Sequence, residues 1–187
     1  MDNKERLGQN IFIVLEGLSG SGKTTVGKLV AKKMGAKFYK TPPPLFETIR
    51  NRVDQEADLT ARFLFYLAGV IQASTEISHF LELNSVVCDR YSLTTICYHR
   101  ALGVTIDIPD LISDSLIKPT HTFLITCEEV KRISRLEKRG LSYNDIQERH
   151  PNIEQRFLSE YRKHRLIEVD NSSDDPAIAA DVILHFC

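Results

Sequence analysis

The sequence predicts an α/β protein with a five-stranded, mainly parallel sheet flanked by helices on both faces. Short apolar segments alternate with longer segments of helical periodicity along the whole chain, which is the pattern of successive strand and helix units. The first apolar segment, residues 11–15, is continuous and rich in β-branched residues, as expected of a strand covered on both faces. A chain of 187 residues suits one domain, or one domain with a small lid.

The remaining elements follow from the same two patterns. Further strands are predicted at residues 37–40, 85–88, 121–126 and 166–169. Helices are predicted at residues 25–34, which end before Gly35, and at residues 59–81, 128–139, 152–164 and 176–185. The run Thr41-Pro42-Pro43-Pro44 is expected to form a stiff loop after the second strand.

Composition excludes several classes of protein. The chain has 24 Lys and Arg against 25 Asp and Glu, a net charge of -1, which argues against a nucleic-acid-coating protein. No apolar run approaches the roughly 18 residues of a membrane span, and no signal-peptide core follows the first residues, so we expect a cytoplasmic protein without a membrane partner. The four cysteines, at 88, 97, 127 and 187, form no C-x-x-C pair and are expected to be small buried residues.

A phosphate-binding loop follows the first strand directly. Residues 17–25 read Gly-Leu-Ser-Gly-Ser-Gly-Lys-Thr-Thr, a complete G-x-x-x-x-G-K-[ST] motif (a P-loop). Inward-turned backbone N–H groups and the following helix N-terminus form an anion site, Lys23 can reach the β- and γ-phosphates, and the Thr24 hydroxyl can bind Mg²⁺. The candidate nucleotide-binding residues are therefore Gly17, Ser19, Gly20, Ser21, Gly22, Lys23, Thr24 and Thr25.

Other P-loop classes fit the sequence poorly. A GTPase needs an N-K-x-D segment and a D-x-x-G loop, and the sequence contains neither. The loop is also similar to that of adenylylsulfate kinases, but the D-G-D-N segment of that family is absent.

Asp89 and Arg90 follow the strand at residues 85–88. A carboxylate at the end of a parallel strand beside the P-loop can hold Mg²⁺ or its water, so Thr24 and Asp89 are the candidate metal ligands. The adjacent arginine can donate two hydrogen bonds to a phosphate. This pair predicts that the chemistry lies at one edge of the sheet.

The segment from Asp89 to His99, D-R-Y-S-L-T-T-I-C-Y-H, resembles the D-R-Y/H-x-x-S-x-x-A-Y-Q segment of thymidylate kinases. Residues 64–68 resemble their L-L-F-x-A helix, residues 135–140 resemble the start of their lid, and the similarity continues in order from about residue 11 to residue 186. The resemblance implies a three-layer P-loop kinase fold over residues 1–187 with a lid at about 136–150. It also implies that ATP with Mg²⁺ phosphorylates a nucleoside monophosphate, above all dTMP to dTDP. The family is commonly dimeric through helices that include residues 59–81, so a second copy of the chain is a candidate partner.

The same resemblance implies roles on the acceptor side. Arg90 would bind the acceptor phosphate, Phe65 would stack on the base, Thr95 would lie near the base edge, and Tyr98 would close against the deoxyribose. Phe65 also lies on the apolar stripe of its helix, so packing in the core is an alternative for it, and Tyr98 has the same alternative.

The predicted lid begins with five cations within nine residues, at 131, 132, 135, 138 and 139. Arg135 and Arg139 lie four apart on one helix face and match arginines of the family. With Lys23, Asp89 and Arg90 they form the candidate catalytic set, because phosphoryl transfer needs positive charge around the migrating group. Lys131, Arg132 and Lys138 are instead expected on a solvated face.

Three positions depart from the family pattern, and all lie on the acceptor side. Ser19 stands where an acidic residue is usual, residues 40–44 replace an R-E-P-G segment, and Gly69 replaces a base-reading arginine. Lys40 can replace the missing R-E-P-G arginine as a point charge. Two alternatives therefore stay open: a kinase of a nucleoside or other hydroxyl-bearing metabolite, with Glu47 as the nearest candidate base, and a nucleotide-binding module without transfer activity.

Overall fold

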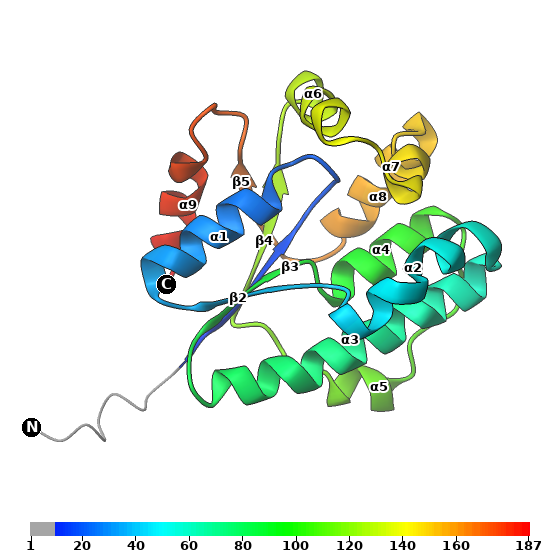
Figure 1. Ribbon diagram of the computed structural model, residues 1–187, viewed down its shortest axis with the longest axis horizontal. Coiled ribbons are helices and arrows are strands. Elements are labelled where there is room, and N and C mark those ends of the chain that lie inside the picture. The colour runs from blue at the N-terminus through cyan, green and yellow to red at the C-terminus, as the bar shows by residue number, and fades with distance from the viewer. Residues whose placement is uncertain (1–9) are drawn as a thin grey trace, which may run out of the picture.

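The computed structural model describes residues 10–187, and the first nine residues, where the sequence predicts no signal segment, lie outside the described part. Five parallel strands form one sheet in the order β2-β3-β1-β4-β5 (Figure 1), which confirms the predicted fold class. The strands are β1 (Phe12–Glu16), β2 (Lys37–Lys40), β3 (Val86–Asp89), β4 (His121–Thr126) and β5 (Ile167–Asp170).

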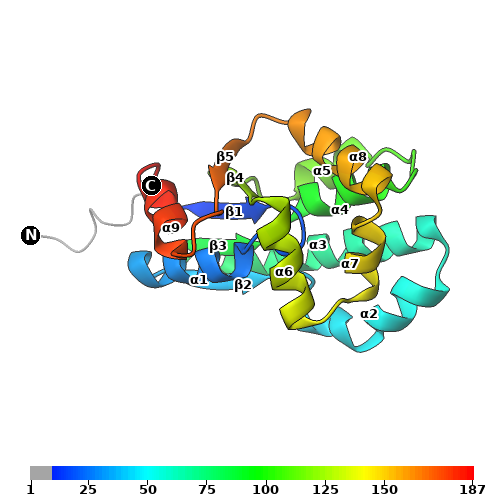
Figure 2. The ribbon, with the colours of Figure 1, turned by 90° about the horizontal axis from the view of Figure 1, so that it is seen from above.

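Helices cover both faces of the sheet. They are α1 (Lys23–Met34), α2 (Pro44–Glu56), α3 (Leu59–Leu81), α4 (Ser92–Ala101), α5 (Asp110–Ser115), α6 (Glu129–Arg139), α7 (Tyr143–Glu148), α8 (Pro151–Arg162) and α9 (Pro176–Leu184). Helices α1 and α9 pack on one face, and α3, α4 and α8 pack on the other (Figures 1 and 2). None of the helices in residues 10–187 is long and apolar enough to cross a membrane.

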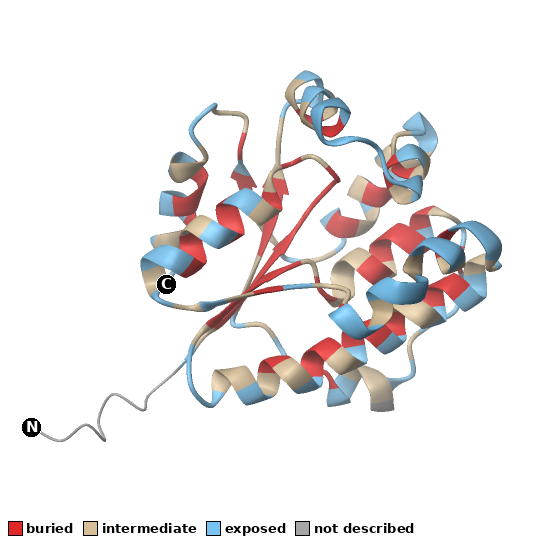
Figure 3. Cartoon of the chain, viewed as in Figure 1, coloured by how far each residue is buried: buried red, intermediate tan, exposed pale blue. Residues whose placement is uncertain are grey.

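The core explains why β1 is the central strand. All five of its residues are buried (Figure 3), and their side chains alternate between the two faces of the sheet. Ile13 and Leu15 pack with α1 and α9, whereas Phe12 and Val14 pack with α3. The continuous apolar run is therefore the sequence of a strand covered on both sides.

Several elements differ from the sequence prediction. Helix α2 begins at Pro44, where only a stiff loop was expected, because proline is well suited to the first turn of a helix. The apolar residues of α2, Leu45, Phe46, Ile49 and Val53, recur at helical spacing, but none of them is buried, and Asp54 is the one buried residue of this helix. Helices α4, α5 and α7 were not predicted as separate elements either. Of the four cysteines, Cys88 and Cys97 are buried as expected, while Cys127 is only partly buried and Cys187 is exposed.

The strand order places the site. Neighbouring strands β1 and β3 lead into helices on opposite faces, α1 and α4, so a crevice opens at their carboxyl ends. The P-loop follows β1 and Asp89 ends β3, so both lie at this crevice. Helices α6 and α7 extend over the same edge of the sheet (Figure 2).

Candidate active site

The P-loop has the backbone that its glycines permit. Gly22 has φ 94°, a left-handed conformation that favours glycine. A Cβ atom at Gly22 would lie 2.2 Å from Nδ2 of Asn171, whose amide donates to the Ser21 carbonyl at 2.8 Å. Ser19 and Ser21 are buried, while Thr25 is exposed. The loop is thus held tightly from the β5 side, and a side chain at position 22 does not fit.

Lys23 is the first residue of α1 and is buried. Its Nζ donates to the Leu18 carbonyl at 2.7 Å and to Ser21 Oγ at 3.4 Å. Burial, and secondly the charge of Arg90, lower the pKa of Lys23 to about 7. The nearby carboxylates Asp89, Glu148 and Glu16 oppose this fall without cancelling it, so bound phosphates would add counter-charge to the ammonium group.

Thr24 and Asp89 are brought together as the sequence predicts. The Thr24 hydroxyl donates a hydrogen bond to Asp89 Oδ2, and the Asp89 side chain is buried at the end of β3. A hydroxyl and a carboxylate are oxygen ligands of the type that Mg²⁺ prefers. Within residues 10–187 no group of three or more His, Cys, Asp or Glu side chains could hold a metal. The pair therefore fits a metal ion that takes its remaining ligands from phosphate and water.

Arg90 joins the P-loop to the neighbouring cavity. Its backbone has φ 70°, which is rare and strained for a residue with a side chain. The guanidinium group donates to the Gly17 carbonyl at 3.1 Å, to Thr94 Oγ1 at 3.3 Å and to Ser19 Oγ at 3.1 Å. All three partners are uncharged, so the positive charge remains available to an anion.

Glu16 is a buried carboxylate at the base of the site that the sequence analysis missed. It accepts hydrogen bonds from the Tyr91 backbone N–H at 3.1 Å, from the Tyr161 hydroxyl at 3.2 Å and from Thr94. Burial raises the pKa of the Glu16 carboxyl, while Thr94 and Arg90 oppose that rise. The sequence did contain a signal for this role, because Glu16 is an acidic residue at the end of a buried strand, directly before the P-loop.

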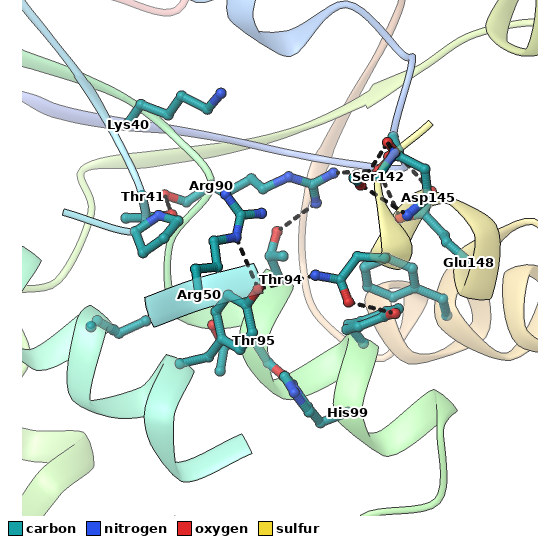
Figure 4. Close-up of a pocket in the computed structure, with 18 of the residues that line it drawn as sticks. Lys40, Thr41, Arg50, Arg90, Thr94, Thr95, His99, Ser142, Asp145 and Glu148 are labelled. Carbon is teal, nitrogen blue, oxygen red and sulfur yellow. Dashed lines mark hydrogen bonds between the residues drawn. The ribbon is translucent and has the colours of Figure 1, made fainter. Parts of the chain in front are cut away.

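A cavity of about 340 Å³ adjoins the P-loop (Figure 4). Its walls come from the P-loop, the end of β2, the helices α2, α3, α4 and α8, and the segment from Arg139 to Glu148. Ser19 and Arg90 belong to both the P-loop site and the cavity wall. A ligand in the cavity would therefore lie next to the phosphates that a P-loop binds.

The cavity includes three of the predicted acceptor-side residues besides Arg90. Lys40, Thr95 and Tyr98 line it, and the last two are buried. Phe65 is not among the lining residues, and its ring packs edge-on against Phe46, with 5.4 Å between the ring centroids. The next residue, Tyr66, lines the cavity instead.

The two predicted lid arginines lie at different parts of the site. Arg135 donates to the carbonyls of Ser21 at 3.5 Å and Asn171 at 3.1 Å, on the P-loop side. Arg139 lines the cavity, and its Nη2 donates to Asp145 Oδ2 at 2.8 Å. The structure therefore places one arginine beside the P-loop and one beside the cavity.

Arg132 is buried, so the prediction that it lies on a solvated face is wrong. Its side chain is only 3% exposed, it pairs with Glu154, and it donates to the Ser19 carbonyl at 3.3 Å. Lys138 is exposed as expected, whereas Lys131 is half-buried and pairs with Asp174. A charge pattern alone could not distinguish Arg132 from its neighbours, because the acid that pairs with it comes from α8.

The segment after α6 brings carboxylates to the P-loop. Glu148 accepts hydrogen bonds from the Ser19 backbone N–H at 2.6 Å and from Ser19 Oγ at 3.0 Å. Arg132 lies 3.9 Å from the same carboxylate. The usual acidic residue is missing from the loop itself, but a buried carboxylate from α7 reaches that position.

A second polar contact joins α7 to the far end of the cavity. The Asn144 amide donates to Asp54 Oδ2 at 2.8 Å and to the Tyr66 hydroxyl at 3.0 Å, and its oxygen accepts from the Tyr98 hydroxyl at 3.2 Å. These partners belong to α2, α3 and α4. The two ends of α7 are thus tied to two different walls of the cavity.

This combination defines a class of protein. The site contains a P-loop with its lysine and a strand-end carboxylate beside the loop threonine. A cavity adjoins them under a helix that carries arginines. These are the parts of a P-loop phosphotransferase of the nucleoside monophosphate kinase class. The chain belongs to the thymidylate kinase family, because the family model described as thymidylate kinase matches residues 15–181.

Individual relatives agree with this assignment. The chain is 33% identical over 136 residues to a probable thymidylate kinase of Methanocaldococcus jannaschii, which covers 71% of this chain and 72% of the relative. It is 29% identical over 153 residues to a thymidylate kinase of Ehrlichia chaffeensis, covering 73% and 76% of the two chains. Among solved structures, the thymidylate kinase of Candida albicans has the same fold, with a TM-score of 0.72 at 20% identity over 95% of this chain and 91% of that one. The crystal structure of the Ehrlichia chaffeensis enzyme gives a TM-score of 0.68 at 23% identity over 94% and 97%.

Proposed function

We propose that this protein transfers the γ-phosphoryl group of ATP to dTMP and thereby forms dTDP and ADP. The observation that carries the proposal is the position of Arg90, which hydrogen-bonds the P-loop and also lines the adjoining cavity. In this proposal, an acceptor phosphate bound by Arg90 would lie beside the γ-phosphate of the donor. Bringing two anionic groups together in this way is most of what phosphoryl transfer requires of a protein.

The donor side would work through charge. Lys23 and the loop N–H groups would bind the β- and γ-phosphates of ATP, and Thr24 and Asp89 would hold Mg²⁺, which neutralises developing charge on the phosphates. Arg135 would stabilise the migrating group from the P-loop side, since its contacts shown here are with neutral groups. Arg139 would approach from the cavity side, although in this structure it is paired with Asp145.

The acceptor would lie in the cavity with its phosphate toward Arg90. Thr95 would be near the base edge and Tyr98 near the deoxyribose, since both are buried in the cavity wall. Phe65 keeps its stacking role in this proposal only if α2 shifts, because Phe46 lies against its ring in this structure. A monophosphate acceptor is already an anion at neutral pH, so the reaction needs no general base.

Three broader features belong to the proposal. Residues 136–150 would form a lid within a single kinase domain and would exclude water from the transfer. The protein would act in the cytoplasm. A homodimer would form through α3, whose Leu64 and Ile71 side chains are 51% and 38% exposed and so leave apolar surface uncovered.

A nucleoside acceptor is the competing proposal, and it requires a carboxylate base. The candidate from the sequence, Glu47, pairs with Arg50 at 3.1 Å and is not among the residues that line the cavity. The carboxylates that do line the cavity, Asp145 and Glu148, are already bound by Arg139 and by Ser19, which favours the monophosphate as acceptor.

A coupled ADP-release assay with ATP, Mg²⁺ and a panel of nucleoside monophosphates and nucleosides tests the proposal. We expect turnover with dTMP above every other acceptor, and none with Lys23→Met. Lys33→Met is the matched control, because Lys33 is an exposed lysine on the same helix. Turnover with nucleosides alone would support the competing kinase, and ATP binding without any turnover would support a module that lacks transfer activity.

A further inference from the structure

Glu16 is a buried carboxylate to which the proposed transfer assigns no part. It ends β1 directly before the P-loop, it is fully buried, and it is not among the residues that line the cavity. A substrate in the cavity would therefore not touch it. Burial of an ionisable side chain costs free energy that its contacts must offset, so these contacts indicate what the residue does.

The Glu16 carboxylate accepts hydrogen bonds from three donors. Its Oε1 accepts from the Tyr91 backbone N–H at 3.1 Å. Its Oε2 accepts from the Thr94 hydroxyl and, at 3.2 Å, from the Tyr161 hydroxyl. The convergence of several donors on one carboxyl group favours its ionised form. Two of these donors, Tyr91 and Thr94, belong to the segment that begins at Arg90.

The contact with Tyr91 holds the strained backbone of Arg90. A φ of 70° is unfavourable for a residue with a side chain and persists only where the surrounding structure enforces it. The Arg90 N–H donates to the Leu15 carbonyl at 3.0 Å, and the next N–H along the chain, that of Tyr91, donates to Glu16. The end of β1 therefore fixes the peptide groups on both sides of the Arg90 Cα atom.

Thr94 connects Glu16 to the guanidinium group of Arg90. The Thr94 hydroxyl donates its one proton to the carboxylate, and Arg90 Nη1 donates to the same hydroxyl oxygen at 3.3 Å (Figure 4). The carboxylate thus sets the direction of the hydroxyl and leaves its lone pairs for the arginine. Nη1 also donates to the Gly17 carbonyl at 3.1 Å, so the guanidinium group is held from two sides of the P-loop entrance.

We infer that Glu16 is a positioning residue for phosphoryl transfer, which holds Arg90 between the P-loop and the cavity through the Tyr91 N–H and the Thr94 hydroxyl. The inference rests on the proposed function, because it gives Arg90 an acceptor phosphate to bind. Phosphoryl transfer depends on positioning, and a displacement of about 1 Å can cost about a hundredfold in rate. Loss of the carboxylate would therefore slow transfer although this group touches no substrate.

The first experiment is steady-state kinetics of Glu16→Gln with ATP and dTMP. Glutamine has the shape of glutamate and keeps an oxygen for the Tyr91 N–H, but it presents an amide donor to the Thr94 hydroxyl. Glu76→Gln is the matched control, because Glu76 also accepts from a tyrosine hydroxyl, that of Tyr39 at 2.8 Å, and does not line the cavity. We expect kcat for dTMP to fall about ten- to hundredfold in Glu16→Gln while KM for ATP changes less than twofold. Glu76→Gln should match the wild type.

A double-mutant cycle shows whether Glu16 acts through Thr94. Thr94→Val removes the hydroxyl at nearly the same shape, and Thr94→Ser keeps it. If the carboxylate acts through this hydroxyl, the double variant should lose no more than about twofold in kcat beyond the less active single variant. Thr94→Ser should keep most of the wild-type kcat. Two independent structural roles would instead give losses that multiply.

Crystal structures of the wild type and of Glu16→Gln test the inference without turnover. We expect the Arg90 guanidinium group to leave the Gly17 carbonyl in the variant. Thr94→Val should show the same release, which keeps the test available if Glu16→Gln does not fold. Unchanged kcat in Glu16→Gln, losses that multiply in the cycle, or an unmoved Arg90 would each overturn the inference.

Turnover by the wild type tests the proposed function separately. If another nucleoside monophosphate is turned over in place of dTMP, the same kinetics are measured with it. If no acceptor is turned over, the proposed function fails, and the crystal structures alone decide whether Glu16 positions Arg90.

Discussion

Binding of ATP should be coupled to proton uptake by Lys23. In the nucleotide-free protein, burial and the nearby Arg90 lower the pKa of Lys23 to about 7, so at pH 8 only about a tenth of the molecules carry this charge. Triphosphate oxygens would restore the pKa toward the ordinary value of about 10.4. We therefore expect uptake of about 0.9 proton per bound nucleotide at pH 8 and about 0.5 at pH 7.

The assay is calorimetric titration with Mg²⁺ and a non-hydrolysable ATP analogue in two buffers that differ in ionisation enthalpy. The difference between the two binding enthalpies gives the number of protons taken up. Lys33→Met should retain the wild-type uptake, and Lys23→Met should lose both the uptake and most of the affinity. Equal binding enthalpies for the wild type at pH 8 would refute the reasoning, because they would mean that Lys23 is already charged before the nucleotide binds.

The same pKa has a consequence for folding. Because the unfolded chain holds this proton more tightly than the native protein, the unfolded state binds more protons between pH 7 and about 10.4. The contribution of Lys23 to the free energy of unfolding should thus rise with pH across that interval. ATP binding should reduce this pH dependence.

Three further predictions follow from the geometry. Glu148→Gln should lower the free energy of unfolding, measured by urea denaturation, by about 2 to 3 kcal/mol, because the substitution removes the charge of a buried acceptor of two hydrogen bonds. The control is Glu137→Gln at an exposed position, which should change the free energy of unfolding by less than about 0.5 kcal/mol. Gly22→Ala should abolish nucleotide binding in the same calorimetric titration, since its Cβ would collide with Asn171 at 2.2 Å, and retained affinity would contradict this account of the loop. Arg135→Ala should lower kcat for dTMP roughly a thousandfold with little change in KM for dTMP, and a rise in KM alone would place this arginine with the acceptor instead.

Much of the fold could be predicted because the signals are local. The strands are short runs with β-branched or aromatic residues, and the P-loop is defined by residue types at fixed spacing, so both are visible in a short stretch of sequence. Helix α2 was missed although Leu45, Ile49 and Val53 recur at helical spacing, because the proline run before them predicted a loop. Helix α7 was not predicted, although its N-terminus has a recognisable sequence signal: Ser142 and Asp145, three residues apart, form a capping box.

The acceptor side was harder because its contacts join distant segments. Glu148 lies 129 residues from Ser19 in the sequence, and Asn144 lies 90 residues from Asp54. No local sequence pattern predicts either of these pairs. Ser19 is a departure from the expected P-loop acid, and no residue near position 19 could indicate that the Glu148 carboxylate of α7 contacts it.

The attachment of α7 at both ends gives the two substrate sites a thermodynamic connection. Its Glu148 end contacts the loop that would hold the donor, and its Asn144 end contacts the wall of the cavity that would hold the acceptor. A ligand that moves α7 away from one wall would therefore also have to break the hydrogen bonds that hold α7 to the other wall. By reciprocity, the free energy with which one substrate alters the affinity of the other is the same in both directions. An equilibrium cycle of four affinities, each substrate with and without its partner, would measure that coupling directly.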